Sequence, residues 1–117
     1  MLKKLTPKYK YAGVYMIKNE RNGKVYIGSS SDIEMCLSKH RNLLANGKHP
    51  CKELQKDYDM KHPMTSHVLY VEPVPSNQRM TDRYRFYAIE WKFIVEYNAI
   101  EKGYNQLPIS KIVQNAI

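Results

Sequence analysis

Alternating apolar and polar positions predict a β-hairpin near the start of the chain. Residues 11–18, YAGVYMIK, alternate as a half-buried strand does, and residues 24–29, KVYIGS, resume the same pattern. The polar segment NERNG between them ends in Asn22-Gly23, a pair that favours the tight turn of a hairpin. We therefore expect two antiparallel strands joined by this turn.

After Ser31 the apolar positions follow a helical period. Ser31 and Glu34 have the spacing of a capping box, which predicts a helix beginning near Asp32. Its inward stripe recurs at intervals of four, three and four residues and consists of Ile33, Leu37, His40 and Leu44. Cys36 lies on the flank of this stripe. Asn46-Gly47 is typical of the end of a helix.

The second half of the chain predicts a helix, a strand and a longer helix. A short helix is expected over residues 50–60, with Pro50 at its first position. Residues 65–74 alternate as a third strand that stops at Pro73. The longest helical pattern covers roughly residues 80–98.

Glu90 lies in the middle of the apolar arc of that last helix. The arc is formed by Phe86, Phe93, Ile94 and Tyr97. A carboxylate is costly to bury without a partner, so a cation, a metal ion or hydrogen bonds are expected beside it. The alternative is a glutamate whose carboxylate reaches solvent past a thin core.

Length, charge and cysteine content narrow the class of protein. A chain of 117 residues is the size of one domain. Nineteen Lys and Arg against eleven Asp and Glu give a net charge of +8, which favours a polyanionic partner such as nucleic acid. Cys36 and Cys51 lack metal-binding spacing and are expected to be reduced thiols.

The N-terminal residues and the overall hydropathy indicate where the protein acts. Residues 1–10, MLKKLTPKYK, are basic, interrupted by Pro7, and read as an arm able to follow a phosphate backbone. They contain no apolar leader, and no stretch of the chain is apolar enough to span a membrane. An intracellular protein, cytoplasmic or nucleoid-associated, is expected.

Two tyrosine motifs and three later features resemble the GIY-YIG nuclease family. In chain order these are Gly13-Val14-Tyr15, Tyr26-Ile27-Gly28, the helix that carries His40, the inward Glu90, and Gly103-Tyr104-Asn105. The resemblance covers residues 11–105. It implies an α+β fold, a small three-stranded antiparallel sheet flanked by helices, which agrees with the order of elements predicted above. The expected nuclease domain covers residues 11–109, followed by a tail over residues 110–117.

The resemblance also implies a chemistry. Tyr15 would act as, or relay to, the general base, with Tyr26 and His40 hydrogen-bonded around it. A tyrosine pKa of about 10 must be tuned by neighbours for this role. Glu90 would bind a single divalent ion, Mg²⁺ or Mn²⁺, since hard oxygen ligands suit both. DNA is the implied substrate.

Five further residues are candidate nucleic-acid contacts. Ser29 and Ser30, with Lys24, lie where a phosphate could approach the end of the second strand. Turn and cap chemistry explains the two serines equally well. Lys39 and Arg41 on the following helix could help select a DNA site, as could the N-terminal arm or an oligomer.

Cys36 departs from the family pattern, which has an arginine at this place. A thiol carries no permanent charge and offers no bidentate donors. By comparison with other arginines that act in phosphoryl transfer, a cysteine here would lower the rate about 10³- to 10⁵-fold. Three explanations stay open: a natural non-catalytic binder, a substitute cation, for which Lys39 has better helical geometry than Arg41, or a disabling change acquired in cloning. A nucleophilic Cys36 is the weakest idea.

The resemblance thus implies a metal-dependent GIY-YIG DNA endonuclease that hydrolyses phosphodiester bonds and is related to homing enzymes, either active or disabled at Cys36. The alternative is a non-catalytic nucleic-acid-binding module with a degenerate GIY-YIG site. Tyr15, Tyr26, His40 and Glu90 favour the enzyme, whereas Cys36 favours the module.

Overall fold

A computed structural model describes residues 9–75 and 83–106, and the statements below concern these residues. The elements follow the predicted order along the chain. They are β1 (Tyr9–Asn19), β2 (Val25–Ser30), α1 (Ile33–Ala45), α2 (Lys52–Asp59), β3 (Met64–Pro75) and α3 (Arg83–Glu96). The first residues of the arm, 1–8, and the predicted tail, 110–117, lie outside the described part, as do residues 80–82 of the predicted last helix.

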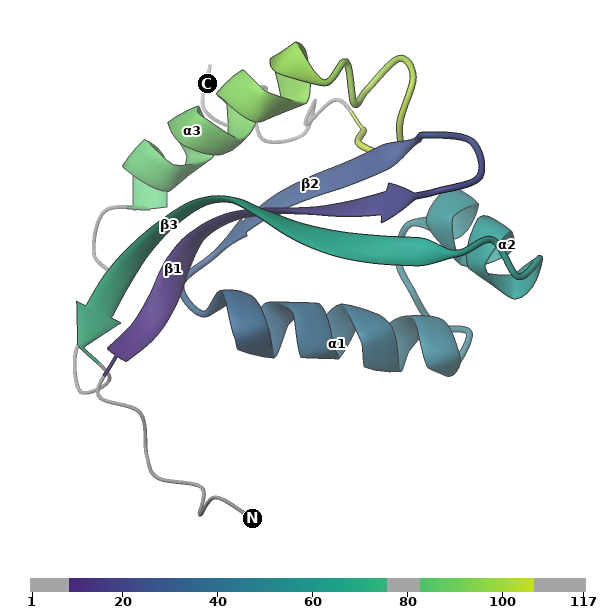
Figure 1. The fold of residues 1–117 in the computed structure, drawn as a ribbon, viewed down its shortest axis with the longest axis horizontal. Coiled ribbons are helices and arrows are strands. Elements are labelled where there is room, and N and C mark those ends of the chain that lie inside the picture. Colours follow the sequence, from purple (N-terminus) through teal and green to yellow (C-terminus); the bar gives the residue numbers. More distant parts are fainter. Residues whose placement is uncertain (1–8, 76–82, 107–117) are drawn as a thin grey trace, which may run out of the picture.

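The three strands form one antiparallel sheet in the order β2-β1-β3. Figure 1 shows α1 against one face of this sheet, α3 against the opposite face, and α2 beside the end of the sheet where the β1–β2 turn lies. The predicted α+β class and the three-stranded antiparallel sheet are therefore confirmed. Because β1 is central, β2 and β3 are both edge strands.

The strand register decides which side chains share a face. Tyr15 lies opposite Gly28, and Ile17 lies opposite Tyr26. Alternate residues of a strand point to opposite faces, so both tyrosines belong to the face covered by α1. Tyr15 and Ile17 pack there with Ile33 of α1, which confirms this assignment.

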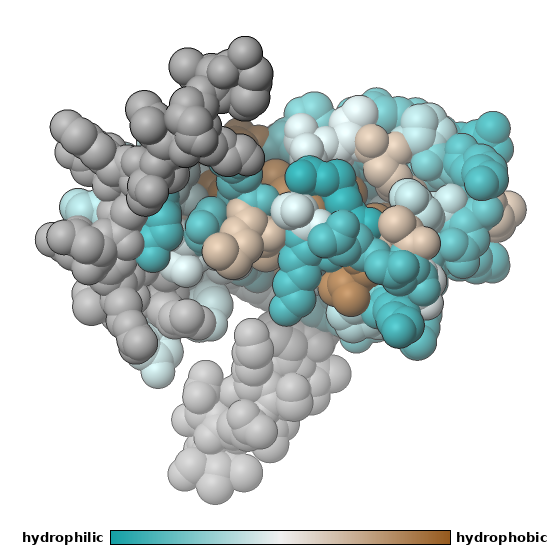
Figure 2. Space-filling view, turned by 90° about the horizontal axis from the view of Figure 1, so that it is seen from below, coloured by the Kyte–Doolittle hydropathy of each residue, from teal (hydrophilic) through white to brown (hydrophobic). Residues whose placement is uncertain are grey.

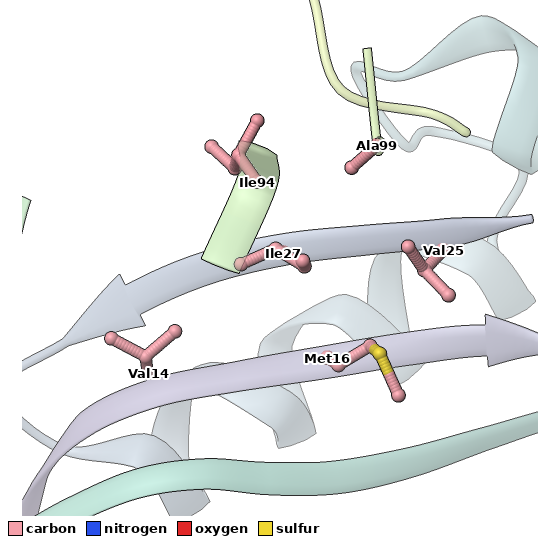
Figure 3. Packing of buried hydrophobic residues seen from close by; sticks show 6 residues of the cluster. All are labelled: Val14, Met16, Val25, Ile27, Ile94 and Ala99. Carbon is pink, nitrogen blue, oxygen red and sulfur yellow. The ribbon is translucent and has the colours of Figure 1, made fainter. Parts of the chain in front are cut away.

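The opposite face of the sheet carries the larger apolar cluster. Figure 3 shows Ile94 and Ala99 packed over the residues of β1 and β2 that point away from α1. The cluster consists of Val14, Met16, Val25, Ile27, Ile94 and Ala99. Burial of apolar surface stabilises a contact by about 25 cal/mol per Å², so this cluster holds α3 on the sheet.

The helix starts differ from the prediction. The side chain of Asp32, not that of Ser31, caps α1, and its Oδ1 accepts from the Met35 N–H at 3.2 Å. The predicted capping box is wrong by one residue, because Asp caps a helix as well as Ser does. In α2 the first helical residue is Lys52, so Pro50 lies two residues before the helix rather than at its first position.

The strands and the last helix also differ at their ends. β1 begins at Tyr9, two residues before the predicted strand and inside the predicted arm. β3 continues to Pro75 past Pro73, which an edge strand permits when the missing N–H would face solvent. α3 ends at Glu96, and Tyr97 is 41% exposed instead of completing the inward arc.

The face that carries α1 is mostly hydrophilic. Figure 2 views this face and shows hydrophobic residues only as separate patches among polar ones. Among the described residues, no helix has the length and apolar composition that crossing a membrane requires.

Candidate active site

The hydroxyl of Tyr15 lies over the main chain of β2. A Cβ built on Gly28 would be only 2.4 Å from the Tyr15 hydroxyl oxygen and 2.6 Å from Cζ. Glycine at position 28 therefore leaves the space that the phenol occupies. Because β2 is an edge strand, the hydroxyl is brought close to the free edge of the sheet although the residue is only 3% exposed.

Two histidines and a backbone amide hold this phenol. His40 Nε2 lies 2.7 Å from the Tyr15 oxygen, and His40 Nδ1 lies 2.7 Å from His49 Nε2. The N–H of Cys51 donates to His49 Nδ1 at 3.0 Å. His49 is almost fully buried between α1 and α2, with 1% exposure, so its hydrogen bonds are made within the protein.

The Cys51 amide fixes the donor and the acceptor in each hydrogen bond of the series Cys51, His49, His40 and Tyr15. Because His49 Nδ1 accepts, a neutral His49 carries its proton on Nε2 and donates it to His40 Nδ1. His40 must then carry its own proton on Nε2, from which it donates to the Tyr15 oxygen. In this state His40 is a hydrogen-bond donor to the phenol and has no lone pair available for the phenol proton.

Burial sets the protonation states of these groups. It lowers the pKa of His40 from 6.5 to about 4, and the positive charges of Lys39 and of a protonated His49 act in the same direction. Burial also lowers the pKa of His49 and raises that of Tyr15 far above 10. At pH 7 the histidines are therefore neutral and Tyr15 is a protonated phenol.

Tyr26 contacts the histidines through its ring. Its ring lies edge-on to His40, with centroids 5.4 Å apart, and edge-on to His49 at 5.9 Å. Burial raises the pKa of Tyr26 as well. The hydrogen bond expected between Tyr26 and Tyr15 is not among those of the described residues, so Tyr26 supports the site by packing.

Cys36 faces the same phenol from the first turn of α1. Its Sγ lies 3.4 Å from the Tyr15 oxygen, where the thiol donates a weak hydrogen bond. Position 36, where the family pattern has an arginine, thus lies beside the Tyr15 hydroxyl. Among the described residues, the Tyr15 oxygen is hydrogen-bonded to Cys36 and to a neutral His40. Neither partner is a cation at pH 7.

Glu90 approaches from the other face of the sheet. It extends from α3, and its Oε1 accepts from the Ser29 hydroxyl at 2.6 Å. Its negative charge adds to the burial that raises the pKa of Tyr15 and of Tyr26, so the carboxylate and the phenols are electrostatically coupled. Of the partners expected beside this carboxylate, the structure shows a hydrogen bond, which Ser29 supplies.

The site thus wraps around the edge of β2. Tyr15 and His40 lie on the α1 face, Glu90 lies on the α3 face, and Ser29 lies between them on the strand. Among the described residues there is no group of three or more His, Cys, Asp or Glu side chains placed to hold a metal ion. A lone carboxylate fits a hard ion that keeps most of its water and takes other ligands from a substrate.

Asn105 closes the β2 edge on one side of this site. Its side-chain amide accepts from the Ile27 N–H and donates to the Ile27 carbonyl, both at 2.8 Å, and the Tyr104 N–H donates to the Val25 carbonyl. The GYN segment therefore pairs with the outer edge of β2 as a short strand would. Asn105 thus has a structural role, because its side chain bonds the backbone of Ile27 at this edge.

A buried polar network anchors the same segment. Asn19 is fully buried, and its Nδ2 lies 2.8 Å from the Tyr104 hydroxyl and 2.9 Å from His62 Nδ1. The Tyr104 hydroxyl donates to Asp57 at 2.6 Å. The β1–β2 turn, α2 and the GYN segment are thus held together behind the site.

The predicted nucleic-acid contacts are spread over several surfaces. Lys24 forms an ion pair with Glu53 of α2, and the Ser30 hydroxyl bonds the backbone of Asp32 at the start of α1. Lys39 is exposed beside His40. Arg41 lines a cavity of about 430 Å³ between α1 and the start of β3.

Sequence reasoning missed His49 and the Asn19 network. Both depend on burial of polar side chains from segments that are distant in sequence, and no periodic pattern marks them. One signal was available in the sequence. His49-Pro50 follows Gly47 in the loop after α1, and the sequence pattern assigns this histidine no role.

Comparisons with known proteins identify the family to which the chain is similar. The sequence model of the family described as the GIY-YIG catalytic domain matches residues 11–105. Intron-associated endonuclease 1 of Enterobacteria phage T4 is 33% identical over 95 residues, which cover 80% of this chain and 36% of that protein. The chain therefore spans about a third of the length of this curated relative.

Two solved structures share the fold. One is the catalytic domain of homing endonuclease I-TevI, with a TM-score of 0.65 and 32% identity over 80% of this chain and 96% of that chain. The other is a mutant of the catalytic domain of intron endonuclease I-TevI, with a TM-score of 0.67 and 29% identity over 81% of this chain and 92% of that chain.

Proposed function

The chain belongs to the GIY-YIG nuclease family, and on that basis we propose that it is a metal-dependent endonuclease that hydrolyses phosphodiester bonds in DNA. The observation that carries the proposal is the placement of Tyr15, His40 and Glu90 around the edge of β2. The net charge of +8 supports DNA as the partner. We place its action inside the cell, in the cytoplasm or at the nucleoid.

Tyr15 is the proposed general base in its ionised form. Hydrolysis needs a group that accepts the proton of the attacking water, and a phenolate does so once its pKa has been lowered. His40, held as an Nε2–H donor, stabilises the phenolate as it forms. Because neither histidine is charged at pH 7, the remaining lowering of the Tyr15 pKa requires a cation near the phenol.

Glu90 is the proposed ligand of a single Mg²⁺ or Mn²⁺ ion. Its carboxylate is a hard oxygen donor beside the free edge of β2, and GIY-YIG nucleases generally depend on a divalent metal. A bound ion would offset the negative charge that develops on the phosphate and leaving-group oxygens. Ser29 orients the carboxylate through its hydrogen bond.

Lys39 and Arg41 are proposed DNA contacts on α1, together with Lys24 and the serines at the end of β2. Lys39 is the better candidate near the phenol because its charge already acts on His40. Recognition of a particular DNA sequence, as in a homing enzyme, would use these residues and the basic arm.

A second function is favoured by Cys36. The thiol beside Tyr15 supplies no positive charge, so the same site could bind DNA without cutting it. In this case the protein is a nucleic-acid-binding module with a degenerate site.

A metal titration combined with a cleavage assay tests the enzyme. Mn²⁺ binding should be weaker in Glu90→Gln than in the wild type, and supercoiled plasmid should be nicked with Mg²⁺ or Mn²⁺ but not with EDTA. Tyr15→Phe should abolish nicking while leaving metal binding unchanged. Equal Mn²⁺ binding in the wild type and Glu90→Gln would remove Glu90 from the metal site. Tight DNA binding without any nicking would favour the binding module.

A further inference from the structure

Within the described residues, the outer edge of β2 has hydrogen-bond partners at two positions and none at the third. Alternate residues of an edge strand point their N–H and C=O groups away from the sheet. Val25 and Ile27 are such residues, because their outward groups bond to Tyr104 and Asn105. Ser29 is the next residue in this series.

The backbone N–H of Ser29 is therefore directed outward from the sheet. Among the hydrogen bonds within the described residues, none uses this N–H, although the Ser29 side chain bonds Glu90. The segment that closes the edge at Val25 and Ile27 does so through residues 104 and 105. Ser29 itself is partly exposed.

This amide lies between the two reactive groups. The Ser29 hydroxyl is 2.6 Å from Glu90 Oε1, so the carboxylate is beside the same residue. The Tyr15 hydroxyl lies over Gly28, whose Cβ position is 2.4 Å from it. Standard backbone lengths then place the Tyr15 oxygen no more than about 6.5 Å from the Ser29 nitrogen. A single phosphate group can bridge that distance.

We propose that the main-chain N–H of Ser29 donates a hydrogen bond to a non-bridging oxygen of the scissile phosphate. The inference rests on the proposed nuclease function of this site and adds a phosphate-binding group to it. A backbone donor aimed at developing charge needs no reorganisation during the reaction. The contact is made by the main chain, so it is present whatever side chain occupies position 36.

The side-chain hydroxyls are less suitable for this task. The Ser29 hydroxyl donates to Glu90, and the Ser30 hydroxyl both donates to and accepts from the backbone of Asp32. The serines predicted as phosphate contacts thus have intramolecular roles for their hydroxyl groups. Within the part of the chain that the structure describes, the donor left without an intramolecular partner at this point of the strand is the Ser29 amide.

Two substitutions separate the amide from the hydroxyl. Ser29→Ala keeps the N–H and removes the hydroxyl, whereas Ser29→Pro removes both. Proline is tolerated on an edge strand where the N–H faces outward. At saturating plasmid DNA, Ser29→Pro should cut about 10²- to 10³-fold more slowly than Ser29→Ala, the loss typical of one oxyanion donor. Cleavage at equal rates by the two variants would overturn the proposal.

An NMR titration gives a readout that does not depend on cleavage or on the folding of the proline variant. In ¹⁵N-labelled wild-type protein, the Ser29 amide proton should move downfield when a short DNA duplex is added. The Ile27 amide, already bonded to Asn105, is the internal control and should move little. An unchanged Ser29 signal, while other signals of the site shift, would overturn the proposal even if the protein cuts DNA. A Ser29 shift without cleavage would uphold the contact and reject the nuclease.

Discussion

Replacing Gly28 by alanine should disrupt the site, because the added Cβ displaces the hydroxyl oxygen of Tyr15. The new Cβ would lie 2.4 Å from the Tyr15 oxygen, whereas ordinary contacts begin near 3.4 Å, so the hydroxyl must move by about 1 Å. Tyr15 is 3% exposed and its oxygen is bonded to His40 at 2.7 Å, so the move strains the core and breaks that bond. We expect a loss of about 1–3 kcal/mol in the free energy of unfolding from overpacking. A displacement of 1 Å at a reacting group can reduce the rate about 100-fold.

Urea denaturation and the rate of plasmid nicking measure the two effects separately. Gly23→Ala is the matched control, because Gly23 has a φ of +78° and nothing lies within 4 Å of its Cβ position. That variant should lose roughly 1 kcal/mol through backbone strain and cut DNA at the wild-type rate. If Gly28→Ala were as stable and as active as Gly23→Ala, the close approach of Tyr15 to β2 would not matter for the reaction.

Three further predictions concern binding, pH and stability. DNA affinity should fall steeply, by about tenfold or more between 50 and 200 mM salt, since the +8 chain releases counterions; a flat response in a filter-binding assay would exclude an electrostatic DNA surface. The folded-state pKa of His40, about 4, lies below its unfolded value of 6.5, so the unfolded state binds more protons between these values and stability falls as the pH is lowered from 6.5 to 4. His40→Gln should weaken this dependence in thermal unfolding, and an unchanged profile would exclude His40 as its source. Tyr104→Phe removes the hydroxyl that bonds Asn19 and Asp57 and should cost about 1–3 kcal/mol in urea unfolding. A loss below about 0.5 kcal/mol would mean that the network adds little to stability.

Much of the fold follows from local patterns that the sequence displays. Strand alternation, the Asn-Gly turn and helical periodicity are local properties, so they gave the correct elements in the correct order. The ends were harder, because Asp32 and Ser31 are both good caps and only the folded chain shows that Asp32 accepts from Met35. Pro73 could not show that β3 continues, since a proline is tolerated at an edge and the sequence does not identify edge strands.

The site was predictable in part. Tyr15, His40 and Glu90 are predicted from the family resemblance, and the structure brings His40 and Cys36 to Tyr15. The hydrogen-bond directions could not be predicted, because they depend on the Cys51 amide that orients His49. The same holds for the Ser29 amide, whose availability depends on how Asn105 pairs with the neighbouring part of the strand.

The central claim is that this is a nuclease site that lacks a positive charge at position 36, where Cys36 stands. The Cys36 thiol is 3.4 Å from the Tyr15 oxygen, so an arginine there would start within reach of the phenol and of a bound phosphate. The most direct measurement is the plasmid cleavage rate of Cys36→Arg relative to the wild type with Mg²⁺ or Mn²⁺. We predict a large gain, up to about 10³- to 10⁵-fold, which Tyr15→Phe and Glu90→Gln each abolish in that background. A Cys36→Arg protein that folds, binds DNA and metal, and still cuts no substrate would contradict the claim. Rapid cutting by the wild type would also contradict the claim. Lys39 would then be the residue that supplies the positive charge.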